Sequence, residues 1–283
     1  MKNEKNKIGV VGNGFVGHAM TLLRPSIDVL VWDIIQEKRD PQTLDIETFV
    51  KESEIIFIAV PTPMNSDGSA NLDIVISVCE EIKSIDKDKH IVLRSTVPPG
   101  TSEKLNVNFM PEFLTEKNWK QDFKNCDQWI LGSHDEKLLN KIERIFESAY
   151  KHGSIINSNV ISCAPSEAEM IKYLKNVFLS VKVGFFNELE SICSSAGLNY
   201  ENIRQIATQD KRIGAGHTMV PGHDGKRGFG GTCFPKDTNA LANFGKSKDT
   251  ETPILNAVIK RNEKIDRPEQ DWKADKGRAV INK

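Results

Sequence analysis

Hydrophobic and polar positions follow two different periods along the chain. In the first half, short apolar runs are separated by segments with helical spacing, which predicts buried strands alternating with helices. The predicted strands are Ile8–Val11, Val29–Trp32, Glu54–Val60, His90–Leu93, Val107–Met110, Gln128–Leu131 and Gly153–Ile156. This alternation favours an α/β fold built on a doubly wound parallel sheet.

The second half is helical in its pattern. From Ser166 to Gly197 apolar residues recur at helical spacing, and Ser166 with Glu169 forms a predicted capping box at the start. Shorter helices are predicted near 201–208 and 253–265, separated by a glycine-rich loop over 214–230. We expect an α/β domain over 1–164, an all-α domain over 165–265, and a polar tail over 266–283 that frays.

Composition narrows the class of protein. The 283 residues include 38 basic and 39 acidic side chains, so nothing indicates a nucleic-acid partner or a membrane surface. No apolar run approaches the roughly 20 residues that a membrane span needs. The five cysteines are scattered and odd in number, which indicates a reducing, cytoplasmic location and no metal site.

A glycine-rich turn follows the first predicted strand. It reads Gly12-Asn13-Gly14-Phe15-Val16-Gly17 and leads into a helical pattern, and Asp33 ends the second strand about 20 residues later. Glycines let the backbone approach a pyrophosphate, and an acid at the ribose favours NAD over NADP. The pattern predicts a Rossmann-like NAD-binding domain. The alternative is an ordinary glycine turn.

Two threonines follow the ends of later strands. In an open parallel sheet the loops after the carboxyl ends of the strands line the ligand crevice. Thr62, after the third strand, and Thr96, after the fourth, are therefore candidate cofactor contacts. Thr96 can equally serve as a helix N-cap ahead of the prolines that follow it.

The densest chemistry lies in Gly228-Phe229-Gly230-Gly231-Thr232-Cys233-Phe234-Pro235-Lys236-Asp237. Glycines before a thiol let other atoms approach closely, Lys236 can favour the thiolate, and Asp237 can handle a proton. Cys233 is thus a candidate nucleophile, although a buried structural cysteine is the alternative. Lys172 and Asn176 stand four apart and share one helix face, where a lysine is commonly just solvated.

These motifs together resemble the UDP-glucose/GDP-mannose dehydrogenase family. The resemblance runs in family order over about residues 7–265 and is most specific at the cysteine motif. Its other segments are the turn at 12–17, Ser95-Thr96-Val97-Pro98, Pro111-Glu112-Phe113-Leu114 with Glu116, the Lys172/Asn176 pair, Phe186-Asn187-Glu188-Leu189 and Asp210-Lys211-Arg212-Ile213-Gly214.

The resemblance implies an NAD-dependent, four-electron oxidation of a nucleotide-sugar C6 alcohol to the carboxylate. In that family a cysteine carries the intermediate as a thiohemiacetal and then a thioester. The implied catalytic residues are Cys233, Lys172, Asn176, Asp237, Glu112 and Thr96. The implied cofactor contacts are Gly12, Gly14, Phe15, Val16, Gly17, Asp33, Thr62, Thr96 and Lys236. The implied substrate contacts are Phe113, Leu114, Glu116, Lys172, Asn176, Arg212 and Gly230.

The family's second Rossmann-like domain, which binds the UDP moiety, is expected to be absent, so the chain is predicted to be a short form. One alternative is a two-domain β-hydroxyacid or 6-phosphogluconate-type dehydrogenase, which performs a single hydride transfer. Another is a non-catalytic NAD-binding relative. The long helix from Ser166 has a broad apolar face, which predicts a homodimer built on residues 166–265.

Overall fold

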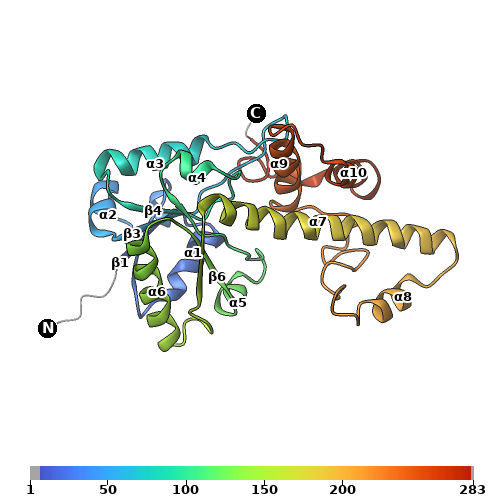
Figure 1. Ribbon diagram of the computed structural model, residues 1–283, viewed down its shortest axis with the longest axis horizontal. Helices are drawn as coiled ribbons and strands as arrows, with labels where there is room; N and C mark the ends of the chain where they lie inside the picture. The colour runs from blue at the N-terminus through green and yellow to red at the C-terminus, as the bar shows by residue number, and fades with distance from the viewer. Residues whose placement is uncertain (1–6, 282–283) are drawn as a thin grey trace. The chain divides into compact units, whose positions relative to one another are not determined.

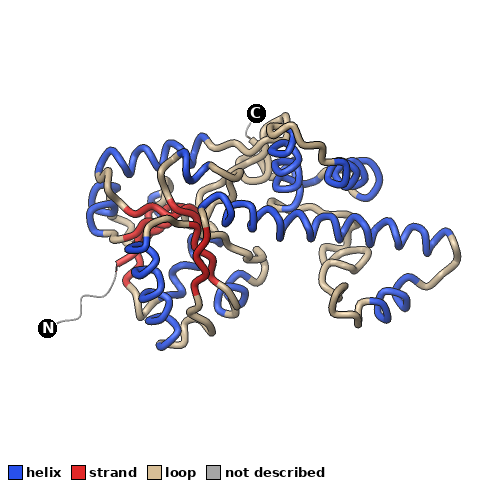
Figure 2. Tube along the Cα trace, in the orientation of Figure 1, coloured by secondary structure: helices blue, strands red, loops and turns tan. Residues whose placement is uncertain are grey.

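A computed structural model describes residues 7–281 of the chain (Figure 1). Two compact units emerge. The first runs up to Thr62 and resumes at Leu72–Lys172, and the second comprises Pro63–Asn71 and Tyr173–Lys283. The predicted α/β class with a helical second part is confirmed (Figure 2). The units differ from the predicted domains because residues 63–71 and the start of the long helix change sides.

The first unit is built on a seven-stranded sheet in the order β2-β1-β3-β4-β5-β6-β7. The strands are β1 (Lys7–Val11), β2 (Asp28–Trp32), β3 (Ile55–Ile58), β4 (His90–Leu93), β5 (Asn108–Phe109), β6 (Trp129–Gly132) and β7 (Val160–Cys163). All neighbours pair in parallel except β5 with β6. The predicted strand over 153–156 is wrong, because the last strand begins only at Val160.

Helices cover both faces of this sheet. They are α1 (Phe15–Ala19), α2 (Ile46–Glu52), α3 (Asp73–Ile85), α4 (Thr101–Lys104), α5 (Trp119–Lys124) and α6 (Glu136–Lys151), with 3-10 turns η1 (Met20–Leu23) and η2 (Gln36–Lys38). Phe146 of α6 packs in one apolar cluster and Phe49 of α2 in the other. Two separate apolar clusters agree with a sheet that is covered by helices on both faces, as the apolar strands predict.

The long helix α7 (Pro165–Ser195) begins in the first unit and continues in the second. Its predicted extent is confirmed, and Gly197 follows its end with φ +68°, where glycine is favoured. The predicted capping box is wrong. Glu167 accepts a hydrogen bond from the Ala164 N–H at 2.9 Å, whereas the Glu169 side chain binds another segment altogether.

The second unit adds α8 (Tyr200–Ala207), α9 (Phe234–Lys246) and α10 (Pro253–Arg261), followed by η3 (Asn262–Asp266) and the 3-10 turn η4 (Asp271–Ala274). The predictions of α8 and α10 are confirmed, while α9 has no counterpart among the predicted helices. Two small apolar clusters lie here, one around Tyr173 and one around Phe186. None of the helices in the described part of the chain is long and apolar enough to cross a membrane.

The prediction that the C-terminal stretch frays is wrong for its described residues. Trp272 and Ala279 are only 3% and 1% exposed. The Met64 N–H donates to the Ala279 carbonyl at 2.9 Å, and the Ile281 N–H donates to the Met64 carbonyl at 3.1 Å. This stretch is therefore packed against residue 64 in spite of its polar composition. Residues 282 and 283 lie outside the described range.

Candidate active site

The glycine turn after β1 has the geometry that a dinucleotide site requires. Gly12 has φ +90°, and a Cβ there would lie 2.5 Å from the Ala59 carbonyl oxygen. A Cβ on Gly17 would lie 1.8 Å from the Gly12 oxygen, so helix and turn pack backbone to backbone. Nothing approaches within 4 Å of a Cβ on Gly14, which leaves that position open to a ligand.

Asp33 lies beside this turn at the end of β2. One carboxylate oxygen accepts the Asn13 N–H at 2.8 Å, and the other accepts the Ile35 N–H at 2.9 Å. Arg39 donates to the Asp33 and Leu44 carbonyls and lies over the Trp32 ring. Its guanidinium is thus occupied within its own segment. An unobstructed glycine turn with an acid beside it, in position to bind a ribose, fits NAD.

Thr62 and Thr96 lie in loops that follow neighbouring strands of the sheet, β3 and β4. They are 4% and 8% exposed. Between them the Ser95 hydroxyl accepts the Val60 N–H at 2.9 Å and donates to the Val60 carbonyl at 2.7 Å. This serine ties the two loops together, a role that its position in the sequence did not reveal.

A buried ion pair joins the two candidate residues Glu112 and Lys172. The Lys172 Nζ lies 2.8 Å from Glu112 Oε1 and also donates to the Glu112 carbonyl. Glu112 Oε2 accepts the Leu114 N–H at 2.7 Å, and the ammonium lies over the Phe113 ring at 5.3 Å. Burial alone would raise the pKa of the Glu112 carboxyl. The charge and hydrogen bond of Lys172, together with the Leu114 N–H and the charge of Arg94, outweigh that effect and lower the pKa of Glu112.

Arg94 is a second cation near Glu112 that sequence reasoning missed. Its side chain is 2% exposed, and within the described residues its Nε and Nη1 have no hydrogen-bond partner. Burial lowers the pKa of this guanidinium, while the charge of Glu112 opposes the shift. The signal was available, because an arginine at the end of a buried strand needs a carboxylate nearby.

Glu169 is a buried carboxylate of a different kind. It accepts the N–H groups of Gly100 and Ser102 at 2.5 and 2.7 Å, and the Ser102 hydroxyl at 2.6 Å. Burial raises its pKa despite these donors. The contacts fasten α7 to the start of α4, in the loop that follows Thr96. This explains why the predicted capping box does not form.

Cys233 occupies the N-cap position of α9 in the second unit. Partial positive charge at that end of a helix favours an anion, which suits a thiolate. The Thr232 hydroxyl lies 3.7 Å from the Cys233 sulfur. None of the five cysteines forms a disulfide. The prediction that a glycine turn presents this cysteine agrees with Gly231, which has φ +70°.

Asp237, one turn further along α9, is 1% exposed. One of its oxygens accepts the Asn176 side-chain amide at 2.6 Å, and the other pairs with Lys236 Nζ at 2.6 Å. Three candidate residues therefore meet here, and Asn176 comes from α7. Lys236 was predicted as a cofactor contact, whereas in the structure its ammonium pairs with the neighbouring Asp237 carboxylate.

Three further candidates are exposed or only partly buried. Glu116 is exposed, and Arg212 has 90% of its side chain exposed and pairs with Asp210 at 2.5 Å. Leu114 is half-buried. Within residues 7–281 no group of three or more acidic, histidine or cysteine side chains is placed to hold a metal.

The structure also reveals anchors of the thiol loop, which we define as residues 224–233. The Asn187 side-chain oxygen accepts the Gly228 N–H at 3.0 Å. The Asn262 amide makes two bonds to the Phe229 backbone, at 2.8 and 2.9 Å. Asn187 lies within a family-like motif but carried no predicted role, and nothing in the local sequence marks Asn262.

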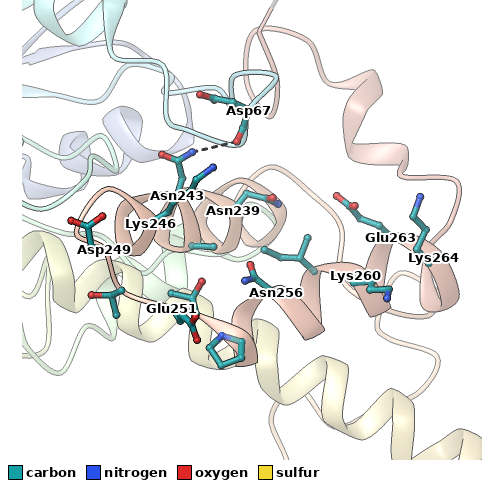
Figure 3. Close-up of a pocket in the computed structure, with 15 residues that line it drawn as sticks. Asp67, Asn239, Asn243, Lys246, Asp249, Glu251, Asn256, Lys260, Glu263 and Lys264 are labelled. Atoms are coloured by element: carbon teal, nitrogen blue, oxygen red, sulfur yellow. Dashed lines mark hydrogen bonds between the residues drawn. The ribbon is translucent and has the colours of Figure 1, made fainter.

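A groove elsewhere in the second unit contains none of the candidate residues. It has a volume of about 710 Å³ and lies along α9 and α10 (Figure 3). Its walls carry charges of both signs, such as Lys246, Asp249 and Glu263. Because Cys233 and Asp237 do not line it, we do not assign it to the candidate chemistry.

Comparisons with known proteins agree with the geometry. The NAD binding domain of the UDP-glucose/GDP-mannose dehydrogenase family matches residues 22–150, and the central domain of that family matches residues 166–264. UDP-glucose 6-dehydrogenase YwqF of Bacillus subtilis is 36% identical over 231 residues, which are 76% of this chain and 50% of that protein. The chain spans about half the length of the curated relatives it matches.

Two solved structures frame the fold. A UDP-glucose dehydrogenase from the archaeon Pyrobaculum islandicum superposes with a TM-score of 0.79 at 28% identity, over 93% of this chain and 69% of that chain. A 3-hydroxyisobutyrate dehydrogenase from Mycobacterium tuberculosis superposes with a TM-score of 0.69 at 14% identity, over 98% and 96%, and shares the fold alone. Since both matched domains come from one family and together span most of residues 22–264, the chain belongs to the UDP-glucose/GDP-mannose dehydrogenase family.

Proposed function

We propose that the protein oxidises the C6 alcohol of a nucleotide sugar to the carboxylate, using NAD and a covalent Cys233 intermediate. One observation carries the proposal. A cysteine heads α9, and one turn later lies the buried Asp237, hydrogen-bonded to Asn176. A single hydride transfer needs no thiol, so the alternative dehydrogenase reaction leaves this arrangement without a purpose.

The reaction balances as two oxidations and one hydrolysis. When bound, NAD would supply the hydride acceptor, and the two oxidations need two NAD molecules because each takes up one hydride. The alcohol first loses a hydride and a proton to give an aldehyde, and the Cys233 sulfur adds to its carbon while the carbonyl oxygen gains a proton. Loss of a second hydride and of the hydroxyl proton leaves a thioester. Water then attacks the thioester carbon, the C–S bond breaks, and carboxylate and thiol are released.

The roles of the other residues follow from their charge and position. Lys172 and Asn176 stand one turn apart on α7 and supply donors to the developing oxyanion. Glu112 holds the Lys172 ammonium in place at 2.8 Å and, with Thr96, orients the attacking water. Asp237 takes the proton of that water during hydrolysis.

Contacts to the sugar nucleotide are assigned to two loops, the one that follows Glu112 and the one that holds Arg212, and to the backbone of Gly230. We propose that Phe113, Leu114 and Glu116 contact the substrate through the loop that Glu112 anchors. Arg212, exposed on its own loop, and the Gly230 backbone complete the substrate contacts. The open position at Gly14, with Phe15, Val16 and Gly17 behind it, takes the cofactor pyrophosphate.

The test is the stoichiometry of NADH. The protein is incubated with NAD and a panel of UDP- and GDP-sugars, NADH is followed by absorbance, and products are identified by mass spectrometry. We expect two NADH per sugar consumed and a sugar carboxylate as product. One NADH per substrate with an aldehyde or ketone product would favour the β-hydroxyacid type. NAD binding without turnover of any sugar would favour a non-catalytic relative.

We also propose a homodimer and a cytoplasmic location. Four large apolar side chains of α7 are 56–62% exposed, namely Leu174, Phe178, Phe185 and Ile192. A second copy is the partner that this apolar face fits, because identical apolar faces pack well across a two-fold axis. Five cysteines without a disulfide suit a reducing compartment. Light scattering at micromolar concentration tests the dimer, and a monomer would contradict it.

A further inference from the structure

The segment after α10 reaches the thiol loop from outside the catalytic motifs. Arg267 lies in this segment, immediately after η3, and its side chain is 5% exposed. Its Nη1 donates to Asp224 Oδ2 at 2.7 Å, while Nε and Nη2 donate to the two oxygens of Asp271 at 2.7 and 2.8 Å. Because Asp224 belongs to the thiol loop, this arginine links the loop to the C-terminal segment.

The guanidinium also lies against the backbone of Gly230. A Cβ on Gly230 would stand 2.5 Å from the guanidinium carbon and 2.7–2.8 Å from two of its nitrogens. Gly230 is not among the residues with positive φ. The glycine is therefore required by the space that Arg267 fills and not by its own backbone conformation.

The charge of Arg267 is already compensated within the cluster. Asp224 and Asp271 neutralise it, and Lys226 lies 2.8 Å from Asp271 and 3.3 Å from Glu269. A doubly paired guanidinium is a poor binding site for a substrate anion, because its fork is filled. Its contacts point to the loop, and the loop ends at Cys233 three residues after Gly230.

We propose that Arg267 is a positioning residue for Cys233. The guanidinium, clamped between Asp224 and Asp271, fixes Gly230 and so sets the course of the chain into the N-cap of α9. Lysine keeps the charge but cannot make the forked contact with two carboxylates. The inference rests on the proposed function only where turnover is measured.

The first test is the reactivity of the thiol without sugar or NAD. Arg267→Lys is compared with the matched control Arg278→Lys, which lies in the same segment and has 44% of its side chain exposed. Alkylation of the peptide holding Cys233 by iodoacetamide is followed by mass spectrometry between about pH 6 and 9. We expect Arg267→Lys to change the rate by about fivefold or more and to shift the midpoint of its pH profile. Arg278→Lys should match the wild type.

A compensating pair provides the second test. A methyl group on Gly230 collides with the guanidinium, so Gly230→Ala should disturb alkylation in the wild-type background. With Arg267→Ala the space is vacant, and adding Gly230→Ala should change the rate by less than about twofold. If the double variant changed the alkylation rate by the product of the two single effects, Gly230 and Arg267 would act independently, which would contradict the contact between them. Far-UV circular dichroism confirms that each variant is folded.

The outcomes separate the two proposals. An Arg267→Lys variant with the wild-type alkylation profile overturns the positioning role, whatever the substrate is. A wild-type protein that oxidises no nucleotide sugar, while Arg267→Lys still alters alkylation, overturns only the proposed function. Where turnover is found, we expect kcat to fall about tenfold or more in Arg267→Lys with KM for NAD unchanged, since the cofactor site is not involved.

Discussion

The sheet of the first unit and the thiol loop of the second are both well defined, but different forces define them. Along β3 every residue is buried, and Phe57 has no exposed surface. The thiol loop contributes no residue to the four apolar clusters of the described chain. Side chains far away in sequence hold it instead, through the hydrogen bonds of Asn187, Asn262 and Arg267.

The two forces differ in how strictly they fix the positions of atoms. Burial of apolar area has no direction, so many side chains of similar volume serve equally well in the sheet. Hydrogen bonds to a loop backbone need particular atoms within a few tenths of an ångström. Damage to the sheet should therefore appear as lost stability, whereas damage to the loop should appear as lost chemistry.

The largest effect is expected at the thiol itself. Cys233→Ser should lower the rate of carboxylate formation by about 10³-fold or more, because a serine adduct is a poor intermediate for the second oxidation. Asp237→Asn should instead slow hydrolysis and let a thioester accumulate on the Cys233 peptide. Product analysis and peptide mass spectrometry separate the two variants. A fully active Cys233→Ser enzyme would refute the role of the thiol.

Within the sheet we expect Phe57→Ala to lower the free energy of unfolding by about 3–5 kcal/mol, the range for an emptied aromatic site in a core. Urea unfolding measures it. The exposed control Ile35→Ala should cost less than about 0.5 kcal/mol. At a temperature where both variants are folded, the alkylation rate of Cys233 should equal that of the wild type. A changed rate would mean that the two regions do not respond separately.

An intermediate effect, on cofactor binding, is expected at Asp33, the polar residue that follows strand β2. Asp33→Ala should weaken NAD binding by about 1–3 kcal/mol, since a charged acceptor for the ribose is removed. NADP binding should change less, and the wild type should prefer NAD. Calorimetric titration with both cofactors tests this, with the exposed Asp28→Ala at the start of β2 as control. Equal wild-type affinity for NAD and NADP would contradict the assignment of Asp33.

The same contrast explains which parts were predictable from the sequence. Apolar periodicity predicted six of the strands approximately and the extent of α7, because burial leaves a repeating pattern. It failed for residues 153–156, where Ile155 is buried outside any strand. The capping-box motif failed at Glu169, because the partners of that carboxylate lie 67 and 69 residues away in the sequence.

The candidate site was predictable only in part. The turn at Gly12–Gly17 and the Cys233 motif have local signatures, and the Lys172–Asn176 spacing places both on one helix face. Neither the Lys172–Glu112 pair nor the Asn262 anchor leaves a local signal, because each joins distant segments. The packed tail was missed for a related reason. Polar side chains of this tail form ion pairs such as Arg267 with Asp271. Its low hydropathy therefore did not mean that the tail is exposed to solvent.

The smallest effect concerns a polar anchor within the sheet unit, the Glu169 carboxylate. Burial raises its pKa, so the native state binds its proton more tightly than the unfolded chain does. Native stability should therefore fall as pH rises from the ordinary glutamate value of about 4.3 toward the raised folded value. Glu112 has a lowered pKa and works in the opposite direction, losing its contribution only as pH falls below that ordinary value. The two effects occupy different pH windows.

We therefore expect Glu169→Gln to be less stable than the wild type, with a deficit that narrows as pH rises through the window above about 4.3. Glutamine does not titrate, and its amide can replace only part of the acceptor role toward Ser102 and Gly100. Urea unfolding of both proteins at several pH values measures the deficit. Glu147→Gln, on the exposed side of α6, serves as control and should show no such narrowing. A deficit independent of pH would mean that the pKa of Glu169 is the same in the native and the unfolded state, and would contradict the raised pKa.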